Sequence, residues 1–493
     1  MEWSNYSKAI FDHYLSKTGN IMVKACPGSG KTTNIKHLWT LDDKPTVYLV
    51  FNKANQLEAQ SKMPYKSDSA ILTLNGLGHR ALLREFGSVL DDRKVLKIID
   101  RDIHFPTYDR HKADHKWALC RAVQQAKSYA LDSVLTPGEY ADIVDTYDLE
   151  TYEGMEGHVN RVLEISDNNL DTVDFDDQIR IPALYRCTFA PYANVLCDEV
   201  QDFSPIQALL VSRLQADRYV FVGDSHQSIY GFRGAMTGSM DYLSAQFHCT
   251  ELPLSITYRC AKNLVKEAAA IYPGIEAFHS APEGTVKYAQ CPDYGDPTIA
   301  LQLRGIMGTM GTMGTMASHD AMVVCRMNRP LIQLAYALLA QDIPCHVRGR
   351  DIGQNLIRLI TKQEATSIAE LRTKLDTWYF EELALAQAKC NDRKIITLED
   401  KHTSLALFMN QCLPSDSPSA VIQKVTALFE QGKGLCLSTI HKAKGLEAEQ
   451  CTILEHGLYP RMVQRSSQVW QKEQEHNCQY VAITRGKTSL VYM

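Results

Sequence analysis

A stretch near the N-terminus has the residue types that cradle phosphate groups. Residues 23–36 read VKACPGSGKTTNIK, in which an apolar run passes into a glycine-containing turn and then into a helical pattern near Lys31. Backbone N–H groups of such a turn point at phosphate oxygens, and a helix N-terminus adds positive partial charge. Lys31 would reach the β and γ phosphates, and the Thr32 hydroxyl would hold Mg²⁺.

One position departs from the usual pattern. Ala25 stands where the pattern has its first glycine, a place that a small residue can fill if its φ angle is negative. Because strand, loop, Lys-Thr pair and helix keep the required order, we predict a nucleotide site here. Its loop residues are Ala25, Cys26, Pro27, Gly28, Ser29, Gly30, Lys31, Thr32 and Thr33.

Two acidic residues end a second apolar run. The sequence NVLCDEVQDFSPIQ places Asp198 and Glu199 at the carboxyl end of a predicted strand, where an α/β sheet positions its ligands. Asp198 would complete the Mg²⁺ shell, and Glu199 would orient or deprotonate an attacking water. An acidic helix cap is a common alternative. Together with the loop, the pair favours nucleotide chemistry.

A third strand end carries an amide and two aromatic residues. In FVGDSHQSIYGFRGA, Gln227 follows the strand, and Tyr230 and Phe232 lie two positions apart beside Arg233. Aromatic rings beside a cation form a platform on which nucleobases stack at about 1–3 kcal/mol each. Core packing is the alternative for these rings, but their place next to a nucleotide-site residue favours a strand-binding role.

The elements that must position these residues alternate along the chain. Apolar runs bounded by turn residues recur as NIMVKA, TVYLVF, NVLCDE, RYVFVG, AMVVCR, GLCLST and SLVYM. Helical patterns such as PLIQLAYALLAQ lie between them. This alternation predicts an α/β fold with mainly parallel sheets.

The chain is too long for one domain, and two regions interrupt the alternation. Its 493 residues suggest about three or four domains. Residues 86–174 and 354–432 are helical in pattern and poor in strands, so we predict that each is an insertion into an α/β domain. The repeat GIMGTMGTMGTMAS lacks apolar periodicity, which indicates a flexible loop rather than a packed element.

Composition excludes few functions. The formal net charge of −5 gives no global bias toward nucleic acid, although a basic groove can coexist with an acidic exterior. The 14 cysteines form no Cys-x-x-Cys pair, which argues against a zinc site or a disulfide framework. No apolar run approaches the length of a membrane span or signal core. We therefore expect a cytoplasmic protein, bacterial or in a viral host.

At this point the chain resembles the UvrD/Rep family of superfamily 1 DNA helicases, almost from end to end. Besides the stretches above, VFNKANQLEA, TLNGLGHRALLR and DFDDQIRIPALY are similar to ordered motifs of its first half. LPLSITYRC, VVCRMNRPLIQLAYALL, LSTIHKAKGLEAE and QYVAITRGKTSLVYM resemble its later motifs. So many matches in the family's order make the resemblance specific.

The resemblance implies two RecA-like motor domains with ATP between them and single-stranded DNA across their top. Residues 1–85 and 175–254 would form the first motor, with 86–174 as its insertion. Residues 255–353 and 433–493 would form the second motor, with 354–432 as its insertion. Both insertions are short for the family, and the chain ends directly after the last motif.

The resemblance also assigns roles around the nucleotide. Arg259 and Arg485 would reach the γ-phosphate, where an arginine contributes about 10³–10⁵ in rate in other NTPases. Gln227 would sense the γ-phosphate, Tyr258 would stack on adenine, and Glu447 would hydrogen-bond the ribose. The implied catalytic set is Lys31, Glu199, Gln227, Arg259 and Arg485.

For the DNA strand, the resemblance implies a set of polar and aromatic contacts that do not read sequence. These residues are Phe51, Asn52, Thr73, Asn75, Tyr230, Phe232, Arg326, Asn328, Thr439 and His441. A strand-end cap or turn is an equal alternative for Thr73, Asn75, Asn328 and Thr439. His441 is favoured as a contact because IHKAKG places cations nearby.

Two positions near the nucleotide depart from the family pattern. Ser7, in SNYSKAIF, occupies the place of an adenine-reading glutamine, and Thr33 stands where some members carry a stacking arginine. A serine cannot make the same bidentate contact to adenine. We therefore predict a relaxed preference for ATP over other nucleoside triphosphates.

The expected activity is ATP-dependent movement on single-stranded DNA in the 3′-to-5′ direction, with unwinding of tailed duplexes, in replication, repair or recombination. ATP and Mg²⁺ are the expected cofactors, and a monomer is expected without DNA. Two alternatives stay open: a translocase that strips proteins from single strands without unwinding, and an RNA helicase, which would differ in how the 2′-OH is read. A binding subunit without turnover is disfavoured because Lys31, Glu199, Arg259 and Arg485 are all present.

Overall fold

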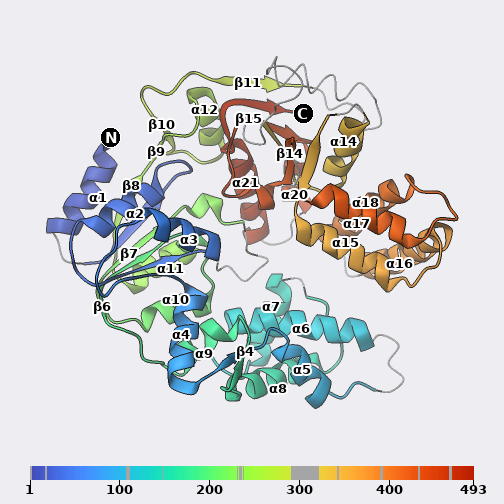
Figure 1. Cartoon of the computed structure of the whole chain (residues 1–493), viewed down its shortest axis with the longest axis horizontal. Coiled ribbons are helices and arrows are strands. Elements are labelled where there is room, and N and C mark those ends of the chain that lie inside the picture. The colour runs from blue at the N-terminus through green and yellow to red at the C-terminus, as the bar shows by residue number, and fades with distance from the viewer. Residues whose placement is uncertain are drawn as a thin grey trace. The chain divides into compact units, whose positions relative to one another are not determined.

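The computed structural model describes residues 3–16, 19–106, 112–147, 149–229, 231, 236, 238–289, 321–340, 343–388, 392–430, 434–465 and 469–493. The chain divides into two compact units, residues 1–256 and 257–493. Each unit is built on a six-stranded parallel sheet with helices around it (Figure 1). The α/β fold class predicted from the sequence is therefore confirmed.

The first sheet has the strand order β3-β2-β6-β7-β1-β8. Its strands are β1 (Ile21–Ala25), β2 (Thr46–Val50), β3 (Ala70–Thr73), β6 (Tyr192–Cys197), β7 (Ala216–Gly223) and β8 (Thr250–Leu254). Neighbouring residues of a strand enter different cores: Met22 packs in one hydrophobic cluster, Ile21 and Val23 in another. The inner strands are mainly apolar because helices cover both faces of the sheet.

The helices of the first unit fall into two groups. Those around the sheet are α1 (Asn5–Ser16), α2 (Lys31–Thr40), α3 (Lys53–Lys62), α4 (Leu74–Phe86), α9 (Asp177–Leu184), α10 (Pro205–Ser212) and α11 (Ser239–Gln246). Those between β3 and β6 are α5 (Lys94–Asp102), α6 (Lys112–Tyr129), α7 (Pro137–Tyr147) and α8 (Met155–Asn168). The second group has its own hydrophobic core and lies together in Figure 1. A short ribbon of β4 (Val89–Leu90) and β5 (Thr172–Val173) runs beside it.

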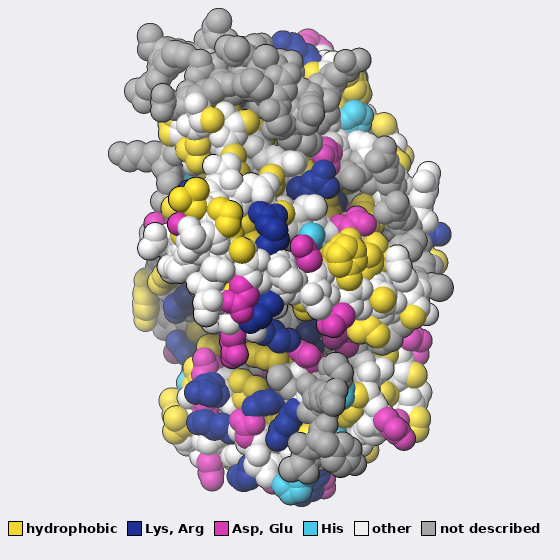
Figure 2. Space-filling view, turned by 90° about the vertical axis from the view of Figure 1, so that its right-hand side faces the viewer, with side chains coloured by type: hydrophobic (Ala, Val, Ile, Leu, Met, Phe, Trp, Pro, Cys, Tyr) yellow, Lys and Arg dark blue, Asp and Glu magenta, His cyan; other side chains and the backbone are white. Residues whose placement is uncertain are grey.

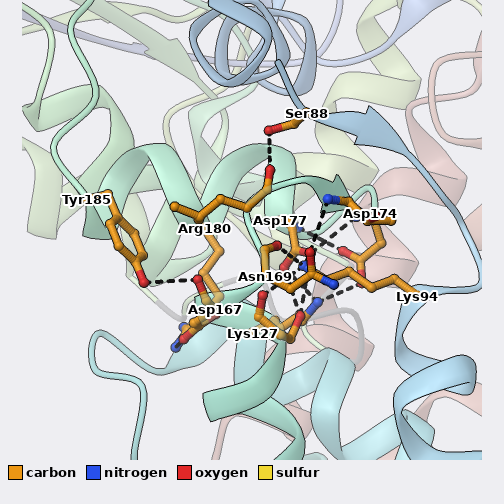
Figure 3. A network of polar contacts seen from close by, with 12 residues as sticks. Ser88, Lys94, Lys127, Asp167, Asn169, Asp174, Asp177, Arg180 and Tyr185 are labelled. Carbon is orange, nitrogen blue, oxygen red and sulfur yellow. Dashed lines mark hydrogen bonds and ion pairs between the residues drawn. The ribbon is translucent and has the colours of Figure 1, made fainter. Parts of the chain in front are cut away.

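A buried polar network anchors the start of α9 to this helical group (Figure 3). The Lys127 ammonium of α6 donates to Asp174 at 2.6 Å and to Asp177 at 2.7 Å. The Lys94 ammonium of α5 donates to the other Asp177 oxygen at 2.7 Å. Arg180 pairs with Asp167 of α8 through its Nε and Nη2 atoms. These three buried cations therefore each have a carboxylate partner, as burial of charges requires.

The second sheet has the order β11-β16-β15-β12-β14-β13. Its strands are β11 (Thr285–Tyr288), β12 (Ala321–Cys325), β13 (Cys345–Arg348), β14 (Leu435–Thr439), β15 (Ala448–Leu454) and β16 (Gly486–Tyr492). A separate pair joins β9 (Ile256–Thr257) and β10 (Glu276–Ala277). All seven apolar runs singled out in the sequence form strands: β1, β2, β6 and β7 in the first sheet and β12, β14 and β16 in the second.

The helices of the second unit also form two groups. Near the sheet are α12 (Lys262–Ile271), α14 (Arg329–Leu339), α19 (Ile440–Ala443), α20 (Leu458–Arg465) and α21 (Val469–Ile483). Between β13 and β14 are α15 (Arg350–Lys362), α16 (Ile368–Ala388), α17 (Asp392–Met409) and α18 (Pro418–Phe429). The second group shares one hydrophobic core with the sheet, through residues such as Leu371, Val425 and Leu437. The boundaries of this insertion at residues 354–432, and the boundaries given above for the other domains, stay predictions.

Surface composition agrees with the low net charge. Basic, acidic and hydrophobic side chains are interspersed over the described part of the face drawn in Figure 2. Among the described residues, no helix combines the length and the apolar character that a membrane span needs.

Candidate active site

Three neighbouring strands of the first sheet end at the candidate nucleotide site. Because β6, β7 and β1 are adjacent and parallel, their carboxyl ends lie at one edge of the sheet. The loop to Lys31 follows β1, Asp198 and Glu199 follow β6, and Asp224 and Gln227 follow β7. Residues up to 200 positions apart in sequence thus meet at one place.

The loop after β1 takes the backbone conformation that its glycines allow. Gly28 and Gly30 have φ angles of 72° and 81°, in the left-handed region that favours glycine. Ala25 is the last residue of β1 and keeps strand geometry, so the substitution of the usual glycine does not strain the loop. The Ser29 hydroxyl donates to the Cys26 carbonyl at 2.8 Å, which closes the turn before α2 begins at Lys31.

Lys31 and Glu199 form an ion pair at the centre of the site. The Lys31 Nζ lies 3.1 Å from the Glu199 Oε1, and both side chains are largely buried. Burial alone would lower the pKa of Lys31, but the negative charges of Glu199, Asp224 and Asp198 outweigh it and raise the pKa. The lysine is therefore a fixed cation surrounded by three carboxylates.

Glu199 is held in an unusual backbone conformation. Its φ angle of 54° places a non-glycine residue in the left-handed region, which is rare and costs energy. The Gln201 side-chain amide donates to the other Glu199 oxygen. Backbone and side-chain contacts together aim this carboxylate at the Lys31 ammonium.

Asp198 has an electrostatic environment suited to a bound cation. Burial, reinforced by the charge of Glu199, raises the pKa of its carboxyl to about 6. The Tyr48 hydroxyl of β2 donates to one of its oxygens at 3.0 Å, and the Glu199 backbone N–H donates to the other at 2.9 Å. A divalent cation would favour the ionised form that burial disfavours.

The residues present fit Mg²⁺ only together with a nucleotide. Among the described residues, no group of three or more His, Cys, Asp or Glu is placed to hold a metal ion. Mg²⁺ commonly binds through one or two carboxylates, waters and substrate phosphates, so Asp198 and the exposed Thr32 hydroxyl form an adequate protein share.

A chain of hydrogen bonds joins Gln227 to the ion pair. The Gln227 side-chain amide donates to Asp224 at 2.6 Å, and the Asp224 backbone N–H donates to the Gln201 side-chain oxygen at 3.0 Å. Gln201 in turn contacts Glu199. Sequence reasoning missed Asp224 and Gln201, although Asp224 directly follows β7 and obeys the same strand-end rule as Asp198.

The predicted nucleotide residues of the second unit lie together. The Arg259 Nε donates to the Glu447 Oε2 at 2.7 Å, and its Nη1 donates to the Thr484 carbonyl at 3.2 Å, one residue before Arg485. Lys487 also pairs with Glu447, at 3.1 Å. Partial burial would raise the pKa of Glu447, but Arg259 and Lys487 lower it.

Arg485 and Tyr258 differ strongly in exposure. Arg485 is 1% exposed and its guanidinium donates to the carbonyl groups of Val481 and Leu446, both at 2.9 Å. Burial and the neighbouring Arg259 lower the pKa of Arg485 to about 9. Tyr258 is 45% exposed, with its ring 4.8 Å from that of Phe278, so one part of this cluster is open to a ligand.

The strand residues predicted in the first unit occupy helix starts. Asn52 accepts from the Asn55 backbone N–H and caps α3, while Thr73 accepts from the Gly76 N–H and caps α4. The Asn75 side chain donates to the Phe175 carbonyl at 2.7 Å. The capping alternative is thus observed for Thr73, and the contact of all three residues with DNA stays a prediction.

Phe51 and Asn75 also line a pocket of about 340 Å³ in the first unit. Phe175, Asp176, Asp202 and Gln207 line the same pocket. Phe175 is 55% exposed and was missed as a candidate, although it lies in the motif DFDDQIRIPALY. The signal available in the sequence was an aromatic residue flanked by aspartates in a stretch already singled out.

The strand residues predicted in the second unit make internal contacts. Arg326 forms two hydrogen bonds of 2.8 Å with Glu475, and Asn328 donates to Asp400 of α17 at 3.0 Å. Thr439 is buried before α19, and the His441 Nε2 lies 3.7 Å from the Cys478 Sγ. These contacts fix the side chains without testing their proposed role.

Two predicted features fall outside the described residues. They are the aromatic pair Tyr230 and Phe232, and the Met-Gly-Thr repeat. Their structural roles stay predictions.

Strand ends that gather a glycine loop, a lysine, and acidic and amide side chains define an α/β nucleotide-binding protein with a phosphate-binding loop. Comparison with known families narrows this class. The UvrD/REP helicase N-terminal domain matches residues 68–248, and the UvrD-like helicase C-terminal domain matches residues 396–493. The chain belongs to the UvrD/Rep helicase family, which confirms the resemblance found in the sequence.

Individual relatives are distant. DNA helicase II of Escherichia coli is 24% identical over 278 residues, covering 51% of this chain and 38% of the relative. The ATP-dependent DNA helicase PcrA of Bacillus subtilis is 25% identical over 282 residues, covering 51% and 37%. F-box DNA helicase protein 1 of Schizosaccharomyces pombe is 26% identical over 259 residues, covering 46% and 28%. The matched stretch therefore spans about a third of the relatives' length.

Proposed function

We propose that this protein is an ATP-dependent motor that moves on single-stranded DNA in the 3′-to-5′ direction and unwinds tailed duplexes. The observation that carries the proposal is the Lys31–Glu199 ion pair beside Asp198, at the ends of three adjacent strands. The residues proposed as cation, base and metal ligand thus belong to one site. The family membership and the printed activities of the distant relatives support the DNA part of the proposal.

In this proposal the phosphates of ATP bind along the loop at residues 25–33. Lys31 neutralises phosphate charge, and Thr32 and Asp198 hold Mg²⁺, which supplies further charge neutralisation when bound. Glu199 orients and deprotonates the attacking water. Because a bound phosphate competes for the Lys31 ammonium, nucleotide binding would release Glu199 for this task.

Gln227 would report the state of the phosphate through its bond to Asp224 and the link to Gln201. Arg259 and Arg485 would stabilise the negative charge that develops on the transferred phosphate. Tyr258 would contact adenine, and Glu447 would contact the ribose. Arg485 would have to exchange its bonds to backbone carbonyls for the nucleotide. Only such differential contacts allow hydrolysis to shift a conformational equilibrium.

The strand would be bound by the predicted polar and aromatic residues of both units. Exposed Phe51 is suited to base stacking, and Asn52 and Thr73 cap helix N-termini, which would attract the backbone phosphates of the strand. The same proposal includes replication or repair proteins as partners. It also includes a monomeric state without DNA and a cytoplasmic location.

ATP hydrolysis measured with and without nucleic acid tests the proposal. We expect single-stranded DNA to raise kcat at least about tenfold, and single-stranded RNA of the same sequence to raise it less. Lys31→Ala serves as the inactive control, and Lys36→Ala, on the same helix beyond the loop, as the matched charge control. Hydrolysis that no nucleic acid stimulates would overturn the proposal, and equal stimulation by RNA would redirect it toward an RNA motor.

A further inference from the structure

The pocket beside Phe51 has the size and lining of a site for one nucleobase. Its volume of about 340 Å³ lies at the small end of the roughly 300–1,000 Å³ typical of small-molecule pockets. Two aromatic side chains on its wall are open to solvent, Phe51 at 47% and Phe175 at 55% exposure. Exposed rings of this kind stack on bases without regard to sequence.

One side chain on the wall differs from these sequence-tolerant rings. Asp176 is partly buried and lines the pocket. Within the described part of the chain, no hydrogen bond or ion pair engages its carboxyl group. Its neighbours Asp174 and Asp177 are bound to Lys127 instead, as Figure 3 shows. The Lys127 ammonium is therefore already paired with these two carboxylates.

The same network fixes the turn that carries Asp176. The Asp177 backbone N–H donates to Asp174 at 2.8 Å, and the Asp174 N–H donates to Asp177 at 3.2 Å. The Phe175 carbonyl accepts from Asn75 at 2.7 Å. Bonds on both sides of Asp176 hold the backbone, so its carboxyl group is positioned before any ligand binds.

We propose that this pocket holds one base of the bound strand and prefers guanine, whose adjacent N1–H and N2–H₂ donors match the Asp176 carboxylate. The inference rests on the proposed function and adds base preference to a motor otherwise expected to ignore sequence. An ionised carboxylate only accepts hydrogen bonds. Guanine offers it two neighbouring donors, whereas the pairing edges of adenine and cytosine offer a donor beside an acceptor.

The preference depends on pH because the carboxylate form is required. Burial, reinforced by Asp174, raises the pKa of Asp176 to about 7. The charged groups around it are Asp174 and Asp177 on its own turn and Lys127 from α6, and Asp202 also lines the pocket. Above this pKa the carboxylate accepts both guanine donors, and below it the neutral acid loses the match.

The test measures binding of the full chain, without nucleotide, to labelled 16-residue thymidine strands that carry one central guanine, hypoxanthine or adenine. Several binding registers fit such a strand, so the protein can place the preferred base in the pocket. Hypoxanthine lacks only the N2 amine of guanine. At pH 8 we expect guanine to bind about fivefold to a hundredfold tighter than hypoxanthine, because hypoxanthine lacks one of the two hydrogen bonds to the charged carboxylate. At pH 6 the difference should shrink to less than about threefold.

Asp176→Asn should remove the guanine preference while the strand still binds. Asp171→Asn, an exposed aspartate that does not line the pocket, is the matched charge control and should keep it. Equal affinity of the unaltered protein for guanine and hypoxanthine at pH 8 would overturn this inference alone, even if a variant failed to fold. Failure to bind any of the strands would instead overturn the proposed function.

Discussion

The Lys31 ammonium and the Glu199 carboxylate lie 3.1 Å apart and neutralise each other. The cation suited to a phosphate and the base suited to a water are therefore paired when no nucleotide competes. Since Asp198 and Asp224 add negative charge to the same lysine, a nucleotide without a divalent cation would meet net negative charge. The site should thus require Mg²⁺ and phosphate together.

Glu199→Gln should abolish turnover and leave nucleotide binding in place, because the amide keeps the size of the side chain but cannot accept a proton. We expect kcat to fall by about 10²–10⁴ with the affinity for a fluorescent ATP analogue within about threefold. Glu58→Gln, at an exposed glutamate of α3, is the control. Hydrolysis near the normal rate would reject Glu199 as the base.

Asp198 should destabilise the ligand-free protein at neutral pH. Its pKa is raised from 3.8 to about 6, so folding favours the protonated form, and this contribution to stability is lost as pH rises through about 6. Asp198→Asn should therefore raise the free energy of unfolding by up to about 3 kcal/mol at pH 8, and by about half as much at pH 5, midway between the two pKa values.

Chemical denaturation at the two pH values, with exposed Asp217→Asn as the control, measures this difference. The same experiment with ATP and Mg²⁺ should reverse the order if Asp198 holds the metal, because a neutral amide binds a divalent cation more weakly than a carboxylate does. An equal gain at both pH values would contradict the electrostatic account, and equal stabilisation of both proteins by Mg²⁺ would remove Asp198 from the metal site.

Arg259→Ala should lower DNA-stimulated hydrolysis by about 10³–10⁵ if its guanidinium meets the transferred phosphate. Removing it also frees Glu447 from its 2.7 Å ion pair, so the KM for ATP should rise as well. Lys262→Ala, a nearby partly exposed cation paired with Glu283, is the matched control. A fall in the hydrolysis rate of less than about tenfold would show that Arg259 has a purely structural role.

Discrimination among nucleotides should be weak. Ser7 is 2% exposed and lies within hydrogen-bond distance of Ser4, so its short side chain is not available to read a base. We expect kcat/KM for ATP to exceed that for GTP by less than about tenfold. A competition assay against a relative that carries glutamine at this position would contradict the prediction if both proteins proved equally strict.

The sequence predicted the elements that carry the nucleotide site and missed the four edge strands of the two sheets together with one inner strand, β15. In the run RYVFVG the five residues after Arg218 are buried, because β7 is covered on both faces. The edge strands β3, β8, β11 and β13 were not identified, since an edge strand is only partly covered and mixes polar with apolar residues. β8 even contains Pro253, which suits an edge position.

The site residues also divide into those that a local sequence pattern identified and those that it did not. Strand-end position identified Asp198, Glu199 and Gln227, because a parallel sheet places its carboxyl ends at one edge. The buried state of Arg485 and the pairing of Arg326 with Glu475 depend on packing between segments far apart in sequence. No local pattern encodes such contacts, so they required the structure.

Unwinding of tailed duplexes tests the central claim most directly. Three otherwise identical duplexes would carry a 3′ DNA tail, a 5′ DNA tail or a 3′ RNA tail, with Lys31→Ala as the control for ATP use. We expect ATP-driven opening of the 3′ DNA-tailed duplex alone. Opening from the 5′ tail would contradict the polarity, and no opening while single-stranded DNA still stimulates hydrolysis would contradict unwinding and leave a translocase.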